Sequence, residues 1–178
     1  MIGVISADLN STRVIVDTAS DSDCKNDCPV MSLGDYVSRS GAFAGINGSY
    51  FCPADYPSCY DKKNSFDTLA MNKNKKYSNS DNNVYSMVPA VIFSGNTARF
   101  VGQSIEWGRD TGVDAVLAMQ PLLVSNGNIV FNGDGEPKRG SKGNRSFIGA
   151  TGSTALWSGG YKAGPGRNLP NVLLFVRK

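Results

Sequence analysis

Histidine is absent from this sequence of 178 residues. Its absence excludes a Ser-His-Asp triad, a Cys-His dyad and any metal site built on histidine. The sequence also lacks an apolar run near the roughly 20 residues that a helix needs to span a bilayer. No basic-then-apolar segment follows Met1, so we expect any export signal to have been removed or to lie outside this sequence. Any site chemistry must therefore come from carboxylates, arginine, lysine, tyrosine, hydroxyl groups and backbone dipoles.

Charge is also scarce. Charged residues make up 19% of the chain, and 18 Lys and Arg against 15 Asp and Glu give a net charge of +3. This weak excess carries no zinc-finger or RNA-binding signature, so we expect no nucleic-acid partner. A hydrophobic content of 40% instead indicates one globular domain with a sizeable core. Four cations do gather locally, and they form either a solvated basic loop or an anion site: Lys138, Arg139, Lys142 and Arg145.

The four cysteines fall into two local pairs, Cys24 with Cys28 and Cys52 with Cys59. Four cysteines allow three pairings, and we favour the two local bridges, each pinning a polar loop. A zinc site made from all four thiolates is the alternative, but intervals of three and six residues fit poorly with the usual zinc spacing. Disulfides would place the protein outside the cytosol, in the extracellular space or the periplasm.

Local patterns predict many turns and short strands. Glycine is frequent, at 20 residues, and Asn126-Gly127 between apolar runs is a strong hairpin signal. Ser32 is a plausible N-cap for a short helix that continues to about Arg39. Strands are expected at residues 2–9, 13–18, 41–46, 66–71, 84–93, 98–101, 113–119, 122–124, 129–131, 147–150 and 172–177.

The first two of these strands are interpreted as a hairpin, and Pro89 is taken to mark a sheet edge or a bulge. The predicted fold class is α+β: a single domain with a mixed, mostly antiparallel β-sheet and few helices.

The most informative segment is residues 44–51 (AGINGSYF), in which an apolar run ends in Asn47-Gly48 and is followed by Tyr50-Phe51. Read with QPLLVSNG at 120–127, NRSFIG at 144–149 and GPGRNLPN at 164–171, it resembles the phosphodiester glycosidase family. The tail is similar to a bacterial secreted branch of that family. One member is the lysosomal enzyme that uncovers mannose 6-phosphate by removing N-acetylglucosamine. The resemblance implies hydrolysis of a sugar-1-phosphodiester, without a metal or cofactor, in extracellular or envelope glycans.

The resemblance also implies site roles. Arg145 would grip the phosphate with its planar guanidinium, while Asn47 and Tyr50 would bind sugar hydroxyls. Ser153 and main-chain amides freed by nearby glycines would add donors. The expected catalytic residues are Arg145, Asn47 and Ser153, and the expected substrate-binding residues are Gly48, Tyr50, Gly149 and Gly152.

The chain departs from the family in one place. The family has a strand, a helix and a strand, ending in Asp-Gly-Gly, between the Arg-x-x-Ile-Gly segment and the following Gly-Ser. Here Gly149 is followed almost at once by Gly152-Ser153, so the family's aspartate has no counterpart. A natural deletion, an engineered one, or a segment missing from the sequence would each explain this.

Three functions stay open. The first is the phosphodiester glycosidase, which acts without the flanking carboxylate pair of ordinary glycosidases; Asp35 and Asp55 lie near the motifs but in segments that look exposed. The second is a secreted domain that binds a sugar phosphate or glycan without turnover. The third is a disulfide-stabilised scaffold, in which Asn47-Gly48 is only a turn, Tyr50 and Phe51 are core residues, and Arg145 and Ser153 are surface groups.

Overall fold

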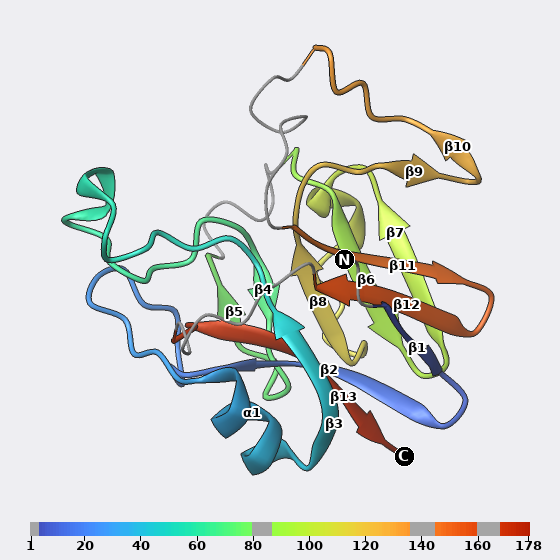
Figure 1. The fold of residues 1–178 in the computed structure, drawn as a ribbon, viewed down its shortest axis with the longest axis horizontal. Helices are drawn as coiled ribbons and strands as arrows, with labels where there is room; N and C mark the ends of the chain where they lie inside the picture. Colours follow the sequence, from blue (N-terminus) through green and yellow to red (C-terminus); the bar gives the residue numbers. More distant parts are fainter. Residues whose placement is uncertain (1–3, 80–86, 136–144, 160–167) are drawn as a thin grey trace.

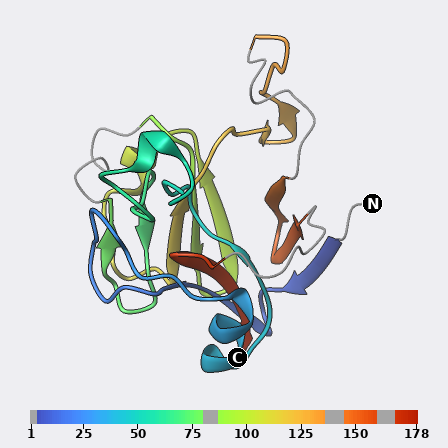
Figure 2. The same ribbon diagram turned by 60° about the vertical axis from the view of Figure 1, so that its left-hand side comes forward.

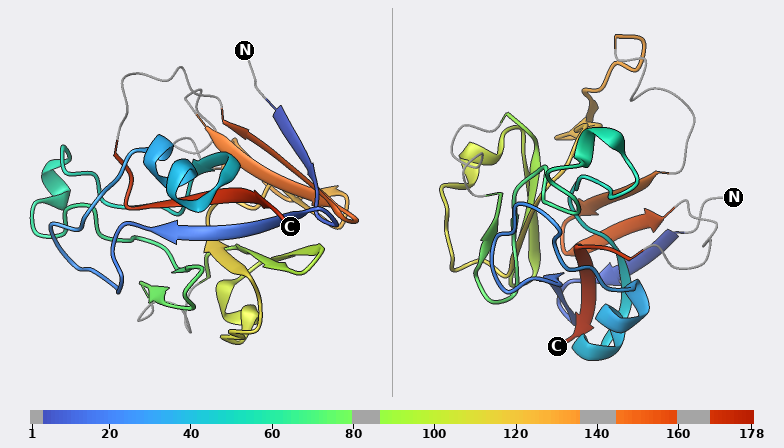
Figure 3. Two further views of the ribbon diagram at one scale, coloured as in Figure 1. Left: turned by 90° about the horizontal axis from the view of Figure 1, so that it is seen from below. Right: turned by 90° about the vertical axis from the view of Figure 1, so that its left-hand side faces the viewer.

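Three layers, helix on sheet on sheet, stack in the body of the molecule (Figures 1 and 3). The computed structural model describes residues 4–79, 87–135, 145–159 and 168–178. The middle layer has the order β2 (Thr12–Thr18), β13 (Asn171–Arg177) and β3 (Ala42–Asn47). Helix α1 (Leu33–Ser40) covers one face of this sheet. The five-stranded sheet covers the other, in the order β5 (Tyr77–Ser78), β4 (Ala70–Met71), β8 (Ala115–Ala118), β6 (Ala90–Ser94) and β7 (Thr97–Val101).

Strand β13 joins the layers because its side chains alternate between two cores. Leu173 and Phe175 pack with residues of β6 and β8. Val172 and Leu174 pack instead with Tyr36 of α1. All four are fully buried. The apolar run of β13 is therefore a central strand covered on both faces, and it fixes the positions of its neighbours β2 and β3.

The helix begins and ends where its capping residues predict. The Ser32 hydroxyl accepts a hydrogen bond from the Asp35 N–H at 3.1 Å, and Gly41 ends the helix in the left-handed region at φ 60°. The predicted Ser32 cap is confirmed. Gly41 turns the chain back into β3, and β3 carries Asn47 at its last position.

A third sheet has three strands, in the order β1 (Val4–Asp8), β12 (Thr154–Gly159) and β11 (Ser146–Thr151). A separate hairpin, β9 (Val124–Ser125) and β10 (Asn128–Ile129), stands away from the sheets (Figure 2). Its turn is Asn126-Gly127, at φ 49° and 78°, which confirms the predicted hairpin. Two short 3-10 helices, η1 (Pro57–Cys59) and η2 (Ser104–Trp107), complete the elements.

The expected α+β class is confirmed, with one α-helix among the described residues and every described strand pairing antiparallel. Two local predictions were wrong, and one strand was missed. β1 and β2 do not form a hairpin, because β1 pairs with β12 and β2 with β13. Pro89 lies just before β6, which is an interior strand between β8 and β7. Strand β12 was not predicted at all.

Both local disulfides, Cys24–Cys28 and Cys52–Cys59, are present. The second bridge is buried and closes the loop that follows Tyr50. Within the described ranges, no helix has the length and apolar character to cross a membrane.

Candidate functional site

Two of the family-like segments meet through one hydrogen bond. The Ser146 hydroxyl donates to Asn47 Oδ1 at 2.5 Å, across 99 residues of sequence. Asn47 is the last residue of β3 and Ser146 the first of β11, and both are exposed. Arg145 directly precedes Ser146 and is also exposed. The structure therefore places the Asn47 side chain against Ser146, the residue that follows Arg145.

Asn171, the first residue of β13, holds the turn after Asn47 through hydrogen bonds. The Gly48 N–H donates to the main-chain oxygen of Asn171 at 3.2 Å, and the Ser49 N–H donates to Asn171 Oδ1 at 2.6 Å. A Cβ on Gly48 would overlap Asn171 Oδ1. Glycine is thus required at position 48 for close packing, which is a structural role and differs from the expected contact with substrate.

Tyr50 leaves the turn toward a different strand. Tyr50 is 50% exposed, so it is not a core residue. Its hydroxyl donates to the main-chain oxygen of Gln120 at 2.9 Å, and its N–H donates to the Thr68 hydroxyl at 3.2 Å. The Thr68 hydroxyl in turn donates to the main-chain oxygen of Ala118 at 2.9 Å. These bonds tie the Asn47 turn to the end of β8.

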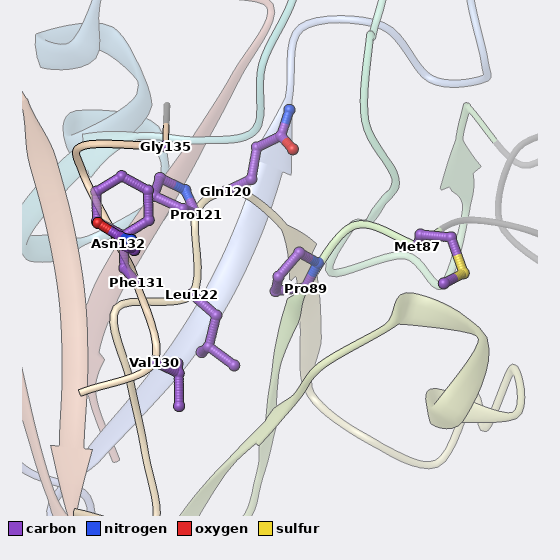
Figure 4. Close-up of a pocket in the computed structure, with 9 residues that line it drawn as sticks. All are labelled: Met87, Pro89, Gln120, Pro121, Leu122, Val130, Phe131, Asn132 and Gly135. Atoms are coloured by element: carbon purple, nitrogen blue, oxygen red, sulfur yellow. The ribbon is translucent and has the colours of Figure 1, made fainter. Parts of the chain in front are cut away.

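Gln120 lines a hollow of about 490 Å³ between the body and the β9–β10 hairpin (Figure 4). Leu122 and Val130, on the two sides of the hairpin, lie next to each other in its wall. Among the described residues that line it, none is charged, and six of the nine are apolar or proline. These nine residues are Met87, Pro89, Gln120, Pro121, Leu122, Val130, Phe131, Asn132 and Gly135. Tyr50, three residues after Asn47, thus donates a hydrogen bond to a residue that lines this open hollow.

Ser153 and Gly152 do not join this site. They form the tight turn between β11 and β12, in which Thr151 pairs with Thr154 and Gly152 has φ 54°. The six residues of β11 place this turn about 17 Å from Ser146. The main-chain oxygen of Ser153 accepts from the Leu9 N–H at 2.7 Å, and its hydroxyl accepts from Asn10 at 3.2 Å. The expectation that Ser153 shares a cavity with Asn47 and Arg145 is therefore corrected.

Gly149 lies in the middle of β11, opposite Leu156 of β12. A Cβ there would meet no atom within 4 Å, so packing does not require glycine at this position. Of the predicted basic cluster, Lys138, Arg139 and Lys142 lie outside the described residues. Asp35 and Asp55 are exposed, and Asp35 is occupied at the start of α1, where it accepts from the Ser32 hydroxyl at 2.7 Å.

A buried carboxylate lies two strands away from Asn47, in the same cross-strand row: Asp17 and Asn47 both pair with Val172. Asp17 forms two salt bridges, one with Arg39 at 2.7 Å and one with Lys73 at 3.0 Å. Burial alone would raise the pKa of Asp17, but the hydrogen bonds from Arg39 and Lys73 outweigh it and hold that pKa below its ordinary value. The two cations therefore compensate the negative charge of Asp17, which reduces its repulsion of an anion bound near Asn47.

Comparison with known protein families finds no family model that matches the chain, and comparison with curated proteins finds no match. The resemblance to the phosphodiester glycosidases therefore remains a prediction from the quoted segments.

Sequence reasoning missed two residues of the site. Ser146 lies inside the quoted NRSFIG segment, and Asn171 ends the quoted tail, yet neither was assigned a role. The signal for Asn171 was available: it is a polar residue at the head of the apolar run of β13, where a buried amide needs partners. The partner of Ser146 could be found only from the tertiary structure.

Proposed function

We propose that this protein recognises a sugar-1-phosphodiester at the Asn47–Ser146 junction and hydrolyses its glycosidic C–O bond. The observation that carries the proposal is the 2.5 Å hydrogen bond between Asn47 and Ser146. It joins two segments that resemble the phosphodiester glycosidases, and it does so beside Arg145. The three side chains offer an amide, a hydroxyl and a guanidinium, which suit an anionic sugar better than a neutral apolar ligand.

The reaction needs little help from the protein at the leaving group. Water attacks the anomeric carbon, the C–O bond breaks, and its electron pair stays on the phosphate oxygen. The products are free sugar and a phosphomonoester, and the proton of the attacking water passes to solvent. Positive charge develops on the ring in the transition state, while negative charge builds on the phosphate. Arg145 would stabilise the phosphate, and Asn47 would hold a sugar hydroxyl.

The hollow that Gln120 lines extends this site. A phosphodiester has a second alcohol beyond the phosphate, and an uncharged group on that side would fit against Gln120 and Leu122. Tyr50 is half exposed and hydrogen-bonds to Gln120, so its ring can contact a sugar face.

A second function, binding without turnover, is favoured by one observation. Gly152-Ser153 is a tight turn where the family carries the segment that ends in Asp-Gly-Gly. A chain that holds the ligand but lacks that aspartate would act as a carbohydrate-binding domain. Both functions agree with secretion, because the two disulfides favour an oxidising compartment such as the extracellular space or the periplasm.

Replacing Arg145 with alanine should lower kcat/KM for a sugar-1-phosphodiester about thirtyfold, because a charge-assisted hydrogen bond contributes about 2 kcal/mol. Methyl phosphodiesters of N-acetylglucosamine, glucose and mannose 1-phosphate are suitable substrates, with free sugar as the measured product. Arg145→Lys should restore only part of the rate, since lysine keeps the charge but loses the planar fork. Arg99→Ala, at an exposed position of β7, is the control and should leave the rate unchanged.

The two functions give different results in this experiment. Sugar release that Arg145→Ala diminishes supports the hydrolase. Binding of the same diesters without release, again weakened by Arg145→Ala, supports the binding domain. Absence of both release and binding for all three diesters contradicts the proposal.

A further inference from the structure

Asn171 is the buried residue on which the Asn47 turn rests, and it is 1% exposed. Its main-chain oxygen accepts from the Gly48 N–H at 3.2 Å. Its side-chain Oδ1 accepts from the Ser49 N–H at 2.6 Å and from the Ser49 hydroxyl at 3.3 Å. Three hydrogen bonds from two successive residues thus converge on one asparagine. Asn171 therefore holds both residues of the turn, Gly48 and Ser49.

These bonds set the orientation of the Asn171 amide. The Ser49 N–H can only donate, so Oδ1 and not Nδ2 must face it. The Nδ2 group then points away from Ser49, and among the described residues it has no hydrogen-bond partner. A buried donor without an acceptor destabilises the folded state.

An aspartate at position 171 would supply the same acceptor without that orphan donor. It would also place a buried negative charge next to Val172, the residue that pairs with Asn47. The chain instead has an uncharged acceptor and leaves one donor unpaired. This choice suits a turn that presents its outer residues to an anion, since a carboxylate beneath it would repel the ligand.

We propose that Asn171 is a positioning residue for the sugar-phosphodiester site: as a neutral acceptor it fixes the Gly48-Ser49 turn, and the turn presents Asn47 and Tyr50. This inference rests on the proposed function for the identity of the ligand. The positioning itself rests on the hydrogen bonds to Gly48 and Ser49 alone.

The test is a pH series on Asn171→Asp, using the methyl phosphodiester of N-acetylglucosamine 1-phosphate as the probe. A phosphodiester stays a monoanion between pH 4 and 8. At pH 7 the affinity of the variant should fall about tenfold below that of the wild type, an effect of about 1.4 kcal/mol. When the carboxyl at position 171 becomes protonated in acid, the affinity should recover, because the neutral acid again serves as an uncharged acceptor.

Two matched variants separate positioning from general damage. Asn72→Asp makes the same change at another buried asparagine, whose amide oxygen accepts from Asn74 and Lys76 within its own turn. It should not show the pH-dependent recovery of affinity. Asn171→Ser removes the amide oxygen without adding charge, so it should lose affinity at every pH.

Amide hydrogen exchange gives a readout that needs no ligand. In Asn171→Ser, which lacks the amide oxygen, the Ser49 amide should lose protection relative to the wild type at the same pH, whereas Asn171→Asp keeps an acceptor and should keep this protection. If the wild type fails to bind the probe, the proposed function fails, and exchange at Ser49 alone decides the role of Asn171. The proposal is overturned if Asn171→Ser keeps wild-type protection of the Ser49 amide, or if Asn171→Asp keeps wild-type affinity at pH 7. It is also overturned if the affinity that Asn171→Asp loses at pH 7 does not recover in acid.

Discussion

Replacing Gly48 with alanine should destabilise the protein by roughly 4 kcal/mol. The added Cβ would overlap Asn171 Oδ1, which is buried and cannot turn away without leaving the Ser49 N–H unpaired. Overpacking and a lost buried hydrogen bond therefore act together. In thermal unfolding, the midpoint should fall by about 12 °C for a chain of this size.

A double-mutant cycle checks the cause of this loss. If the overlap with Asn171 is responsible, Gly48→Ala should cost much less in an Asn171→Ala background than in the wild type. Gly149→Ala is the matched control, because a Cβ there meets nothing within 4 Å. It should change the free energy of unfolding by less than about 1 kcal/mol. A Gly48→Ala variant as stable as the wild type would show that the turn does not need the close approach of Asn171.

Replacing Asp17 with asparagine should cost about 3 kcal/mol of folding free energy at pH 7. The Asp17 carboxylate is 3% exposed, and it accepts from the Arg39 Nε at 2.8 Å, the Ser40 hydroxyl at 3.0 Å and the Lys73 ammonium at 3.0 Å. The Asp17 side chain, on β2, thus links this strand to the end of α1 and to Lys73 in the turn after β4. An amide in its place would leave two cations without their partner.

The loss should also depend on pH in a defined direction. The pKa of Asp17 is lower in the folded protein than its ordinary value, so the folded state favours the ionised form. Its contribution is present above the unfolded pKa of about 3.9 and disappears as the pH falls through the folded pKa. The difference in unfolding free energy between wild type and Asp17→Asn should therefore shrink below about pH 4. Urea titrations at several pH values measure it.

Asp27→Asn is the control for this series. Asp27 meets Lys63 at 3.7 Å and its side chain is 70% exposed, so solvent screens the pair and the substitution should cost no more than a few tenths of a kcal/mol. A difference for Asp17→Asn that stays constant from pH 2 to pH 7 would contradict the assigned role of its carboxylate.

Local signals in the sequence predicted local structure well. The Ser32 cap and the Asn126-Gly127 turn act within a few residues, and both form as expected. Strand partners were harder to predict, because alternation marks a strand without saying what it pairs with. Residues 2–9 were therefore predicted to pair with residues 13–18 in a hairpin, although the Leu9 N–H bonds to Ser153 and β1 pairs with β12.

The candidate site was hard to predict for the same reason, because its contacts join residues far apart in sequence. The sequence offered no sign of the Asn47–Ser146 hydrogen bond, because the ends of β3 and β11 are 99 residues apart and only the tertiary structure brings them together. Ser153 was misplaced, since the sequence alone did not reveal that β11 runs its full length before the turn. Asn171 was overlooked because its partners, Gly48 and Ser49, are 122 residues or more away in sequence.

Mapping the ligand by NMR tests the central claim most directly. The methyl phosphodiester of N-acetylglucosamine 1-phosphate would be titrated to millimolar concentration into isotope-labelled protein. We expect the largest amide shifts at Asn47, Tyr50 and Ser146, with no shift at Ser153. Shifts confined to the Ser153 turn, or none anywhere, would contradict a sugar-phosphodiester site at the junction of β3 and β11.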